Sequence, residues 1–371
     1  MKINTVNLHH ISMPLVSQFE TSKHVERDRE CLLIHVEGDG HEGWGECVAQ
    51  RVPWYSYEST GTAWHVLEEF LVPAILGKEL EEPSEFPEHV AEIKGHPMAK
   101  AGLEMGLWDL AGRIAGEPLA EMLGGERTHV EVGVSIGIQE NGETLLEVVQ
   151  DHLNEGYRRV KLKIKPGMDL EYIQAVREAH PELLLQVDAN AAYDTSQAKV
   201  FEKMDRFGLA LIEQPFQEDD LLAHAELQAR VSTPICLDES IDSVTMARQA
   251  LELDACRIIN IKAGRVGGLT EAIKIHDLCS ARNIPVWCGG MLETGIGRAS
   301  NLALASLPGF TLPGDISATN RYYEVDIANP RFELNSDGTI DVPTGPGLGV
   351  DVDQTALESF TIRTMQFAAK T

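Results

Sequence analysis

The chain lacks the features that would place it in a membrane or in a disulfide-stapled class. Its longest apolar stretches, such as Phe70–Leu76, are far shorter than the roughly 20 residues that a membrane-spanning helix needs. Met1–Pro14 has no basic region followed by an apolar one, so we expect no signal peptide. No CxxC pair occurs among the six cysteines, which are Cys31, Cys47, Cys236, Cys256, Cys279 and Cys288. We therefore expect reduced, buried thiols and a cytoplasmic protein.

Positive charge is also scarce. The 31 lysines and arginines stand against 58 aspartates and glutamates, which gives a formal net charge of −27. Nucleic acid and an anionic membrane surface would repel such a chain, so we expect neither as a partner. Most of the acidic side chains are expected to form a solvated surface, and a few could hold a cation. With 371 residues, 43% of them hydrophobic, the chain can bury one large core and a smaller one.

A repeat of about 25 residues fills the middle of the chain, from Thr128 to Ser317. Short apolar runs expected to be strands are Val130–Ile136, Arg159–Ile164, Leu183–Asp188, Leu209–Glu213, Ile235–Asp238, Arg257–Ile261, Pro285–Cys288 and Phe310–Pro313. Segments with the helical period lie between them, at Leu145–Leu153, Leu170–Ala179, Ala198–Met204, Ala223–Arg230, Met246–Leu253 and Leu269–Ala281. Continuous apolar strands are typical of a parallel sheet buried on both faces. Eight evenly spaced units favour a closed (β/α) barrel over an open doubly wound sheet, so we predict an α/β fold of the barrel type.

The flanking regions have other patterns. Ile3–Pro14, Glu30–Glu37 and Gly43–Ala49 indicate extended segments of an antiparallel meander. Residues 61–125 have helical patterns, the clearest at Ala99–Ile114. We predict three regions: an N-terminal α+β capping domain over 1–125, a catalytic barrel over 126–320, and a C-terminal segment over 321–371 that completes the cap.

Five charged residues occur in phase with the repeat. They lie at the ends of the second to the sixth expected strands in the order Lys163, Asp188, Glu213, Asp238 and Lys262, each 24 or 25 residues after the one before. Alone, such an acid is usually a helix cap or a solvated loop residue, and such a lysine usually lies on the surface. The carboxyl ends of barrel strands, however, surround the active site in this fold. Five charges in phase at that end therefore indicate a catalytic site.

The residue types at these five positions suggest a chemistry. Three carboxylates on adjacent strands cannot all stay ionised close together without a cation. Hard oxygen ligands select Mg²⁺ or Mn²⁺ over zinc. Such a metal would polarise a substrate carboxylate and stabilise the enolate formed when the neighbouring carbon loses a proton. Lys163 and Lys262 flank the carboxylates in strand order, so we predict them as an acid/base pair on opposite sides of the substrate. The cation and the second lysine are expected to lower the pKa of a lysine base.

The motifs around these residues resemble those of a known family. Val160-Lys161-Leu162-Lys163 resembles the KxK motif of the muconate-lactonising subgroup of the enolase superfamily. The metal-ligand motifs of that subgroup are similar to Asp188-Ala189-Asn190, Ile212-Glu213-Gln214-Pro215 and Leu237-Asp238-Glu239-Ser240, and its second lysine segment to Asn260-Ile261-Lys262. The segments most similar to the o-succinylbenzoate synthase / N-acylamino acid racemase family are 95–100, 289–298 and 312–315. The resemblance extends over essentially the whole chain.

This resemblance implies roles for individual residues and a modified TIM barrel of the (β/α)7β type with an α+β cap. It implies Lys163 and Lys262 as the acid/base pair and Asp188, Glu213 and Asp238 as ligands of Mg²⁺, for which Mn²⁺ can substitute. Supporting positions are Lys161, Asn190 and Glu239. Substrate contacts are implied at Ser135, Met291, Leu292, Phe19 and Tyr55, the last two in cap loops that close over substrate. The chain departs from the family at Ala263, where relatives often carry proline, which concerns the loop after Lys262 rather than the lysine itself.

The reaction implied by the resemblance has two main forms. The first is that of o-succinylbenzoate synthase, a lyase of menaquinone biosynthesis that dehydrates 2-succinyl-6-hydroxy-2,4-cyclohexadiene-1-carboxylate. The second is racemisation of N-succinyl- or N-acylamino acids, an isomerase reaction that the same site can support. A dipeptide epimerase, a muconate cycloisomerase and a non-catalytic binding barrel stay open as alternatives. We expect a small-molecule carboxylate substrate and a homo-oligomer, while the number of subunits and the physiological substrate are left undetermined.

Overall fold

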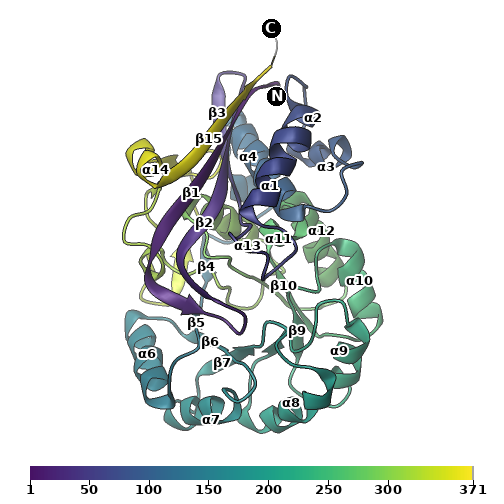
Figure 1. The fold of residues 1–371 in the computed structure, drawn as a ribbon, viewed down its shortest axis with the longest axis vertical. Helices are drawn as coiled ribbons and strands as arrows, with labels where there is room; N and C mark the ends of the chain where they lie inside the picture. Colours follow the sequence, from purple (N-terminus) through teal and green to yellow (C-terminus); the bar gives the residue numbers. More distant parts are fainter. Residues whose placement is uncertain (370–371) are drawn as a thin grey trace.

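An antiparallel sheet with helices packed beside it forms one end of the molecule (Figure 1). The computed structural model describes residues 1–369 of the chain. The sheet has the order β15-β1-β2-β3, and its strands are β1 Ile3–Glu20, β2 Val25–Gly38, β3 His41–Cys47 and β15 Thr361–Ala368. The predicted meander is confirmed, but β1 continues beyond Pro14 to Glu20. Its pairing with β2 is interrupted after Pro14, which has no N–H to donate, and resumes at Phe19.

A close glycine contact joins this sheet to the helices. The helices of this region are α1 Thr60–Val66, α2 Val72–Ile75, α3 Phe86–His89, α4 Pro97–Ala115 and α5 Leu119–Met122. A π-helical turn, Leu67–Leu71, joins α1 to α2, and a 3₁₀ turn, Pro83–Glu85, precedes α3. A side chain on Gly45 of β3 would collide with the backbone at Gly102 and Gly106 of α4. Glycine at these positions therefore lets α4 lie directly on β3.

Seven parallel strands form most of the barrel. In the order in which they pair they are β5 Val134–Ile136, β6 Arg159–Lys163, β7 Leu184–Asp188, β8 Ile212–Glu213, β9 Ile235–Leu237, β10 Ile258–Ile261 and β11 Val286–Cys288. The ring closes through two parallel bridges, Val286 to Phe310 and Val132 to Gly314. The predicted barrel is confirmed. The expected eighth strand, Phe310–Pro313, makes only a bridge, because proline and glycine within and beside it limit its ladder.

The barrel helices lie outside the strands (Figure 1). They are α6 Gly142–Glu155, α7 Leu170–Ala179, α8 Ala198–Met204, α9 Leu221–Gln228, α10 Val244–Glu252, α11 Ala263–Val266, α12 Leu269–Ser280 and α13 Gly295–Ala305, with 3₁₀ turns Thr195–Gln197, Asp205–Phe207 and Thr319–Arg321. All six expected helices are present. The short α11 and the whole of α13 were not expected. Every residue of α13 is buried, so the helix has no polar face to produce the amphipathic period.

The C-terminal region returns to the cap. Two small antiparallel ladders pair β12 Ala328–Asn329 with β14 Asp351–Val352, and β13 Thr339–Asp341 with β4 His129–Glu131. After α14 Gln354–Phe360, β15 pairs with β1. The expected first barrel strand was therefore too long, because its first residues belong to β4. The predicted domain boundaries stay predictions. No helix within residues 1–369 combines the length and apolar composition needed to cross a membrane.

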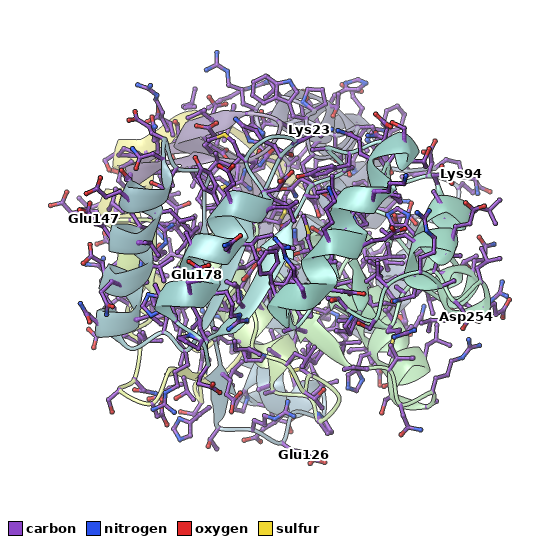
Figure 2. All side chains as sticks on the ribbon, turned by 90° about the horizontal axis from the view of Figure 1, so that it is seen from below. Lys23, Lys94, Glu126, Glu147, Glu178 and Asp254 are labelled. Atoms are coloured by element: carbon purple, nitrogen blue, oxygen red, sulfur yellow. The ribbon has the colours of Figure 1, made fainter. Side chains whose placement is uncertain are left out.

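The turn between β1 and β2 reaches the carboxyl end of the barrel. The Glu20 carbonyl accepts a hydrogen bond from Ile138 N (2.9 Å), just beyond β5, and the Glu20 carboxylate pairs with Lys165 Nζ (3.0 Å), just beyond β6. Viewed along the perpendicular direction, Lys23 of this turn and Glu126 before β4 lie at opposite ends of the layer of barrel helices (Figure 2). The β1–β2 turn therefore covers the end of the barrel where the predicted site residues lie.

Candidate active site

Three carboxylates lie side by side at the ends of neighbouring strands. Asp188 ends β7, Glu213 ends β8, and Asp238 directly follows β9. The parallel register pairs Asp188 with Glu213. All three side chains are buried. Their order around the barrel is the one that the repeat predicted.

Cationic and amide side chains surround this acidic trio. Lys161 Nζ lies 2.7 Å from Glu213 Oε2 and 3.2 Å from Asp188 Oδ2. On the other side, Asn260 Nδ2 donates to Glu213 Oε1 (2.7 Å). Lys161 points inward from β6 and also approaches an oxygen of Asp315 (2.5 Å). The supporting role implied for Lys161 thus has a geometric counterpart, since its ammonium bridges three carboxylates.

The two predicted catalytic lysines stand at opposite ends of the trio. Lys163 Nζ is 2.6 Å from Asp188 Oδ2, and Lys262 Nζ is 2.8 Å from Asp238 Oδ2. Tyr55 Oη donates to Asp238 Oδ1 (2.9 Å) and lies 3.1 Å from Lys262 Nζ. Each of the two lysines therefore pairs with a carboxylate. Asp188, Glu213 and Asp238 lie in strand order between the two amines.

Burial and mutual repulsion shape the charges of the trio. Burial, and then the charge of Asp188, raises the pKa of Glu213 to about 8. Burial also acts to raise the pKa of Asp188, but the adjacent ammonium groups of Lys163 and Lys161 outweigh it and lower this pKa to about 2. For Lys262, burial lowers the pKa and the charge of Asp238 raises it by more, so the net direction is upward. The lowered lysine pKa expected from the sequence depends on a bound cation beside the lysine, and it stays a prediction.

The donor set fits a hard divalent cation in its chemistry. Three carboxylates from adjacent strands supply oxygen ligands of the kind that Mg²⁺ prefers. After burial, the charge of Asp188 is the next cause that raises the pKa of Glu213, as expected for carboxylates on neighbouring strands. As the side chains stand, no three His, Cys, Asp or Glu residues in the range 1–369 converge closely enough to hold an ion. Lys161, Lys163 and Lys262 each pair with an oxygen of these carboxylates.

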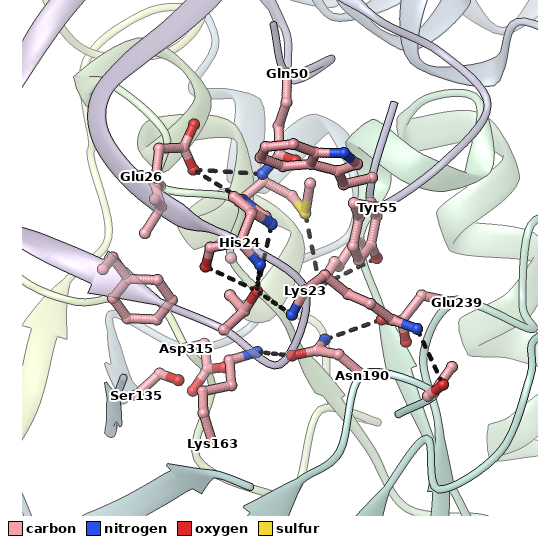
Figure 3. Close-up of a pocket in the computed structure, with 18 of the residues that line it drawn as sticks. Lys23, His24, Glu26, Gln50, Tyr55, Ser135, Lys163, Asn190, Glu239 and Asp315 are labelled. Atoms are coloured by element: carbon pink, nitrogen blue, oxygen red, sulfur yellow. Dashed lines mark hydrogen bonds and ion pairs between the residues drawn. The ribbon is translucent and has the colours of Figure 1, made fainter. Parts of the chain in front are cut away.

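A cavity of about 190 Å³ is lined by the lysines that pair with the trio (Figure 3). Its walls include every non-metal residue predicted from the sequence: Phe19, Tyr55, Ser135, Lys161, Lys163, Asn190, Glu239, Lys262, Met291 and Leu292. The Ser135 hydroxyl is buried and makes no hydrogen bond within the described part of the chain. A buried hydroxyl without a partner is costly, which makes Ser135 a candidate for a polar contact with substrate.

A hydrogen-bonded loop after β11 supplies one wall of this cavity. Leu292 has φ +57°, a left-handed conformation that costs about 1–3 kcal/mol for a residue with a branched side chain. Two buried groups hold it there: Tyr323 Oη donates to Leu292 O (2.6 Å), and Glu293 Oε2 accepts from Met291 N (2.8 Å). Asn301 on α13 fixes the other oxygen of Glu293 (2.9 Å). The unexpected helix α13 thus positions a wall of the site.

A further pair of side chains connects the first lysine to the opposite wall. Asn190 Oδ1 accepts from Lys163 Nζ (2.8 Å), while Asn190 Nδ2 donates to Glu239 Oε1 (2.9 Å). Burial, and then the charges of Asp238 and Asp188, raises the pKa of Glu239 to about 8. Asn190, which lies just beyond β7, therefore orients the amine of Lys163, which ends the neighbouring strand β6.

Several residues around the candidate site were not predicted. Arg265, three residues beyond Lys262 on α11, pairs with Asp238, and Asp315 receives both Arg159 and Lys161. The cavity is also lined by Lys23, His24, Glu26, Gln50, Gln217, Glu218 and Tyr322. Spacing could have suggested Arg265, because a helical turn brings it back toward its starting point. No local signal marks Lys23 or Gln217, which reach the cavity from separate loops.

The chain is similar to known proteins over its whole length. Residues 3–124 match the N-terminal domain of the mandelate racemase / muconate lactonizing enzyme family, and residues 144–356 match the family described as enolase C-terminal domain-like. An o-succinylbenzoate synthase of Geobacillus kaustophilus is 51% identical, with 97% of this chain and 96% of the relative covered. An N-succinylamino acid racemase of an Amycolatopsis species is 52% identical, with 94% of this chain and 95% of the relative covered. A crystal structure of an enolase superfamily member from Listeria innocua has a TM-score of 0.96 and 41% identity, covering 99% of both chains.

Proposed function

Because this chain belongs to the mandelate racemase / muconate lactonizing enzyme family of the enolase superfamily, we propose that it is an o-succinylbenzoate synthase that also racemises N-succinylamino acids. Both reactions begin with removal of a proton from the carbon beside a carboxylate. One arrangement supports this most strongly, namely two lysines at opposite ends of a buried acidic trio in one cavity. Binding alone would need neither lysine in that position, which argues against a non-catalytic barrel.

The chain's own residues can carry the proton transfers of the dehydration. Lys163 takes the proton from the substrate carbon and returns one to the departing hydroxyl, so that water leaves and the ring becomes aromatic. Lys262 stays charged and stabilises the negative charge of the enolate. Asn190 holds the amine of Lys163 toward the cavity by its 2.8 Å contact. The Met291–Leu292 wall and the β1–β2 turn exclude water from the reacting atoms.

Racemisation uses the same two amines differently. One lysine removes the proton from one face of the substrate carbon, and the other delivers a proton to the opposite face. Each base reaches only its own face, since the two are anchored at opposite ends of the trio. The 52% identity of this chain to an N-succinylamino acid racemase supports this second activity.

A divalent cation completes the proposal. Enzymes of this superfamily depend on a metal ion. We assign Mg²⁺, or Mn²⁺ in its place, to Asp188, Glu213 and Asp238, where it would stabilise the charge that develops on the substrate carboxylate. Lys161, which holds Glu213 and Asp188, would orient these ligands. We also propose a cytoplasmic location and a homo-oligomer, the former in keeping with six free, buried cysteines.

Proton exchange tests the two-base geometry. In D₂O with Mg²⁺, proton NMR should show loss of the α-proton signal from both enantiomers of an N-succinylamino acid. Lys163→Ala should abolish exchange mainly from one enantiomer and Lys262→Ala mainly from the other, and each should lower kcat by roughly 10²–10⁴-fold. Neither variant should racemise, because racemisation needs both faces. Undiminished racemisation by either variant would exclude that lysine as a base.

Formation of the aromatic product tests the lyase activity separately. Purified enzyme with Mg²⁺ should convert the cyclohexadiene carboxylate to o-succinylbenzoate, which NMR or ultraviolet absorbance can follow. Exhaustive chelation should stop the reaction, and added Mg²⁺ or Mn²⁺ should restore it. Absence of turnover with both this substrate and the N-succinylamino acids would refute the proposed function.

A further inference from the structure

One lysine of the cavity differs from the others in its partners. Four line the walls, namely Lys23, Lys161, Lys163 and Lys262. Each of the last three has a carboxylate oxygen within 3.2 Å. Lys23 forms no ion pair with any of the residues described, and its Nζ donates to the carbonyl of Ala191 (3.1 Å). It is therefore the cavity ammonium whose charge the protein itself leaves uncompensated.

The contact of Lys23 can be exchanged at little cost. The Ala191 carbonyl also accepts a hydrogen bond from Gln217 Nε2 (2.7 Å) and keeps this partner if Lys23 moves away. An ammonium group has three N–H donors, of which the protein uses one here. Lys23 can thus take a new acceptor without leaving a buried carbonyl unsatisfied.

The position of Lys23 suits the far end of a substrate. Ala191 directly follows Asn190, the residue that contacts the Lys163 amine. Figure 3 shows Lys23 over the cavity, between Tyr55 on one side and Asn190 on the other. In an N-succinylamino acid, the terminal carboxylate lies about 6 Å from the α-carbon by the bond lengths of an extended amide chain. An acyl chain that extends from the α-carbon toward the opening of the cavity therefore reaches the region around Lys23.

The positive charge of Lys23 makes its position in the cavity selective for anions. The protein carries a formal net charge of −27, and the acids Glu26 and Glu218 line the same mouth. Glu26 lies 3.8 Å from Arg29 Nη1 and accepts from Gln50 Nε2 (3.4 Å), so a cation of the protein already opposes its charge. Lys23 is left as the local attraction for an anion entering an acidic molecule.

We propose that Lys23 selects substrates with a second carboxylate, by pairing its ammonium with the terminal carboxylate of the succinyl group. This inference rests on the proposed function, whose two substrates share that group. On binding, Lys23 Nζ exchanges the Ala191 carbonyl for the substrate oxygen, and the β1–β2 turn that carries it closes over the acyl chain. Substrates whose acyl chain ends in a neutral group lose this pairing.

Two substrates that differ in one terminal group test the inference. They are the N-succinyl derivative of one amino acid and its terminal carboxamide, which has nearly the same size. Wild-type kcat/KM for racemisation should favour the carboxylate by about tenfold, as expected for a charge-assisted hydrogen bond at a partly exposed site. Lys23→Met should bring the ratio near one, and Lys23→Arg should retain most of the preference. In about 1 M salt the wild-type preference should shrink, because the Debye length falls to about 3 Å.

Arg27→Met is the matched control. Arg27 is an exposed cation four residues further along the same hairpin and does not line the cavity. Its removal changes the net charge by the same amount, and the preference should stay at the wild-type value. An equal loss of kcat/KM on both substrates in Lys23→Met would show that Lys23 only holds the turn. Wild-type kcat/KM values on both substrates in this variant would show that Lys23 takes no part in selection. Either result overturns the inference while the proposed function stands. A wild-type enzyme inactive on both proposed substrates would overturn the function and this inference with it.

Discussion

Replacing Glu46 by glutamine should remove one defined contribution to the pH dependence of stability. Glu46 lies on β3 of the cap and is fully buried. Its Oε2 accepts from Thr294 N (3.0 Å), Thr294 Oγ1 (2.7 Å) and Gly297 N (3.1 Å), all at the start of α13. This side chain thus joins the cap to the helix that supports the Met291–Leu292 wall. A glutamine oxygen can accept the same three hydrogen bonds, so the variant should fold.

The size of the effect follows from the pKa of Glu46. Burial, and then the charge of Glu293, raises this pKa from 4.5 to about 7. The folded protein therefore binds the Glu46 proton more tightly than the unfolded chain does. The resulting stabilisation is fully present below pH of about 4.5 and is lost as the pH rises through about 7. Between pH values of about 5 and 8, the free energy of unfolding should lose about 2.5 kcal/mol through this group.

Urea unfolding at a series of pH values, followed by tryptophan fluorescence, measures this effect. The unfolding free energy of the wild type minus that of Glu46→Gln should fall by about 2.5 kcal/mol from pH of about 5 to about 8. Subtraction cancels the titrating groups that do not interact with Glu46. Glu143→Gln is the control, because Glu143 lies exposed in the first turn of α6. A difference that stays constant to within about 0.5 kcal/mol, or that rises with pH, would refute the assignment of the raised pKa to Glu46.

Three further changes test the site and its support. Glu213→Gln should weaken Mg²⁺ binding by at least roughly tenfold in titration calorimetry while the far-ultraviolet spectrum stays native, and unchanged affinity would remove Glu213 from the ligands. Lys163→Ala and Lys262→Ala should keep melting temperatures within a few degrees of the wild type, because each leaves its partner carboxylate beside a second cation. A collapse of the fold in calorimetry would assign the lysine a structural role. Glu58→Ala should lower the unfolding free energy by about 1–2 kcal/mol, since Glu58 accepts the first two N–H groups at the start of α4 at 2.7 and 3.0 Å. Urea unfolding measures this loss, and a stability equal to that of the wild type would contradict it.

The barrel and the order of its charged residues were predictable because both depend on local regularities. Asp188, Glu213 and Asp238 recur with the strand–helix unit, and parallel strands of one sheet bring equivalent positions to the same end. The helix α13 escaped prediction because it is buried on all sides. The expected first strand merged β4 with β5, since both are short apolar runs and only their partners distinguish them.

The sequence by itself determined which charged residues meet at the carboxyl end of the barrel and in what order they surround it. Tertiary structure alone decided how they are held: Tyr55 meets Asp238 across 183 positions of the chain, Glu46 meets Thr294 across 248, and Lys23 meets Ala191 across 168. Such contacts leave no period in the sequence, because they depend on how the cap docks onto the barrel. The ion pairs of Lys163 with Asp188 and of Lys262 with Asp238 join neighbouring units of the repeat, but the repeat alone did not predict that these side chains would touch. Burial makes an unpaired charge costly, so each lysine takes the acceptor that the closed barrel brings within reach, and that choice is made by distances that a linear pattern does not contain.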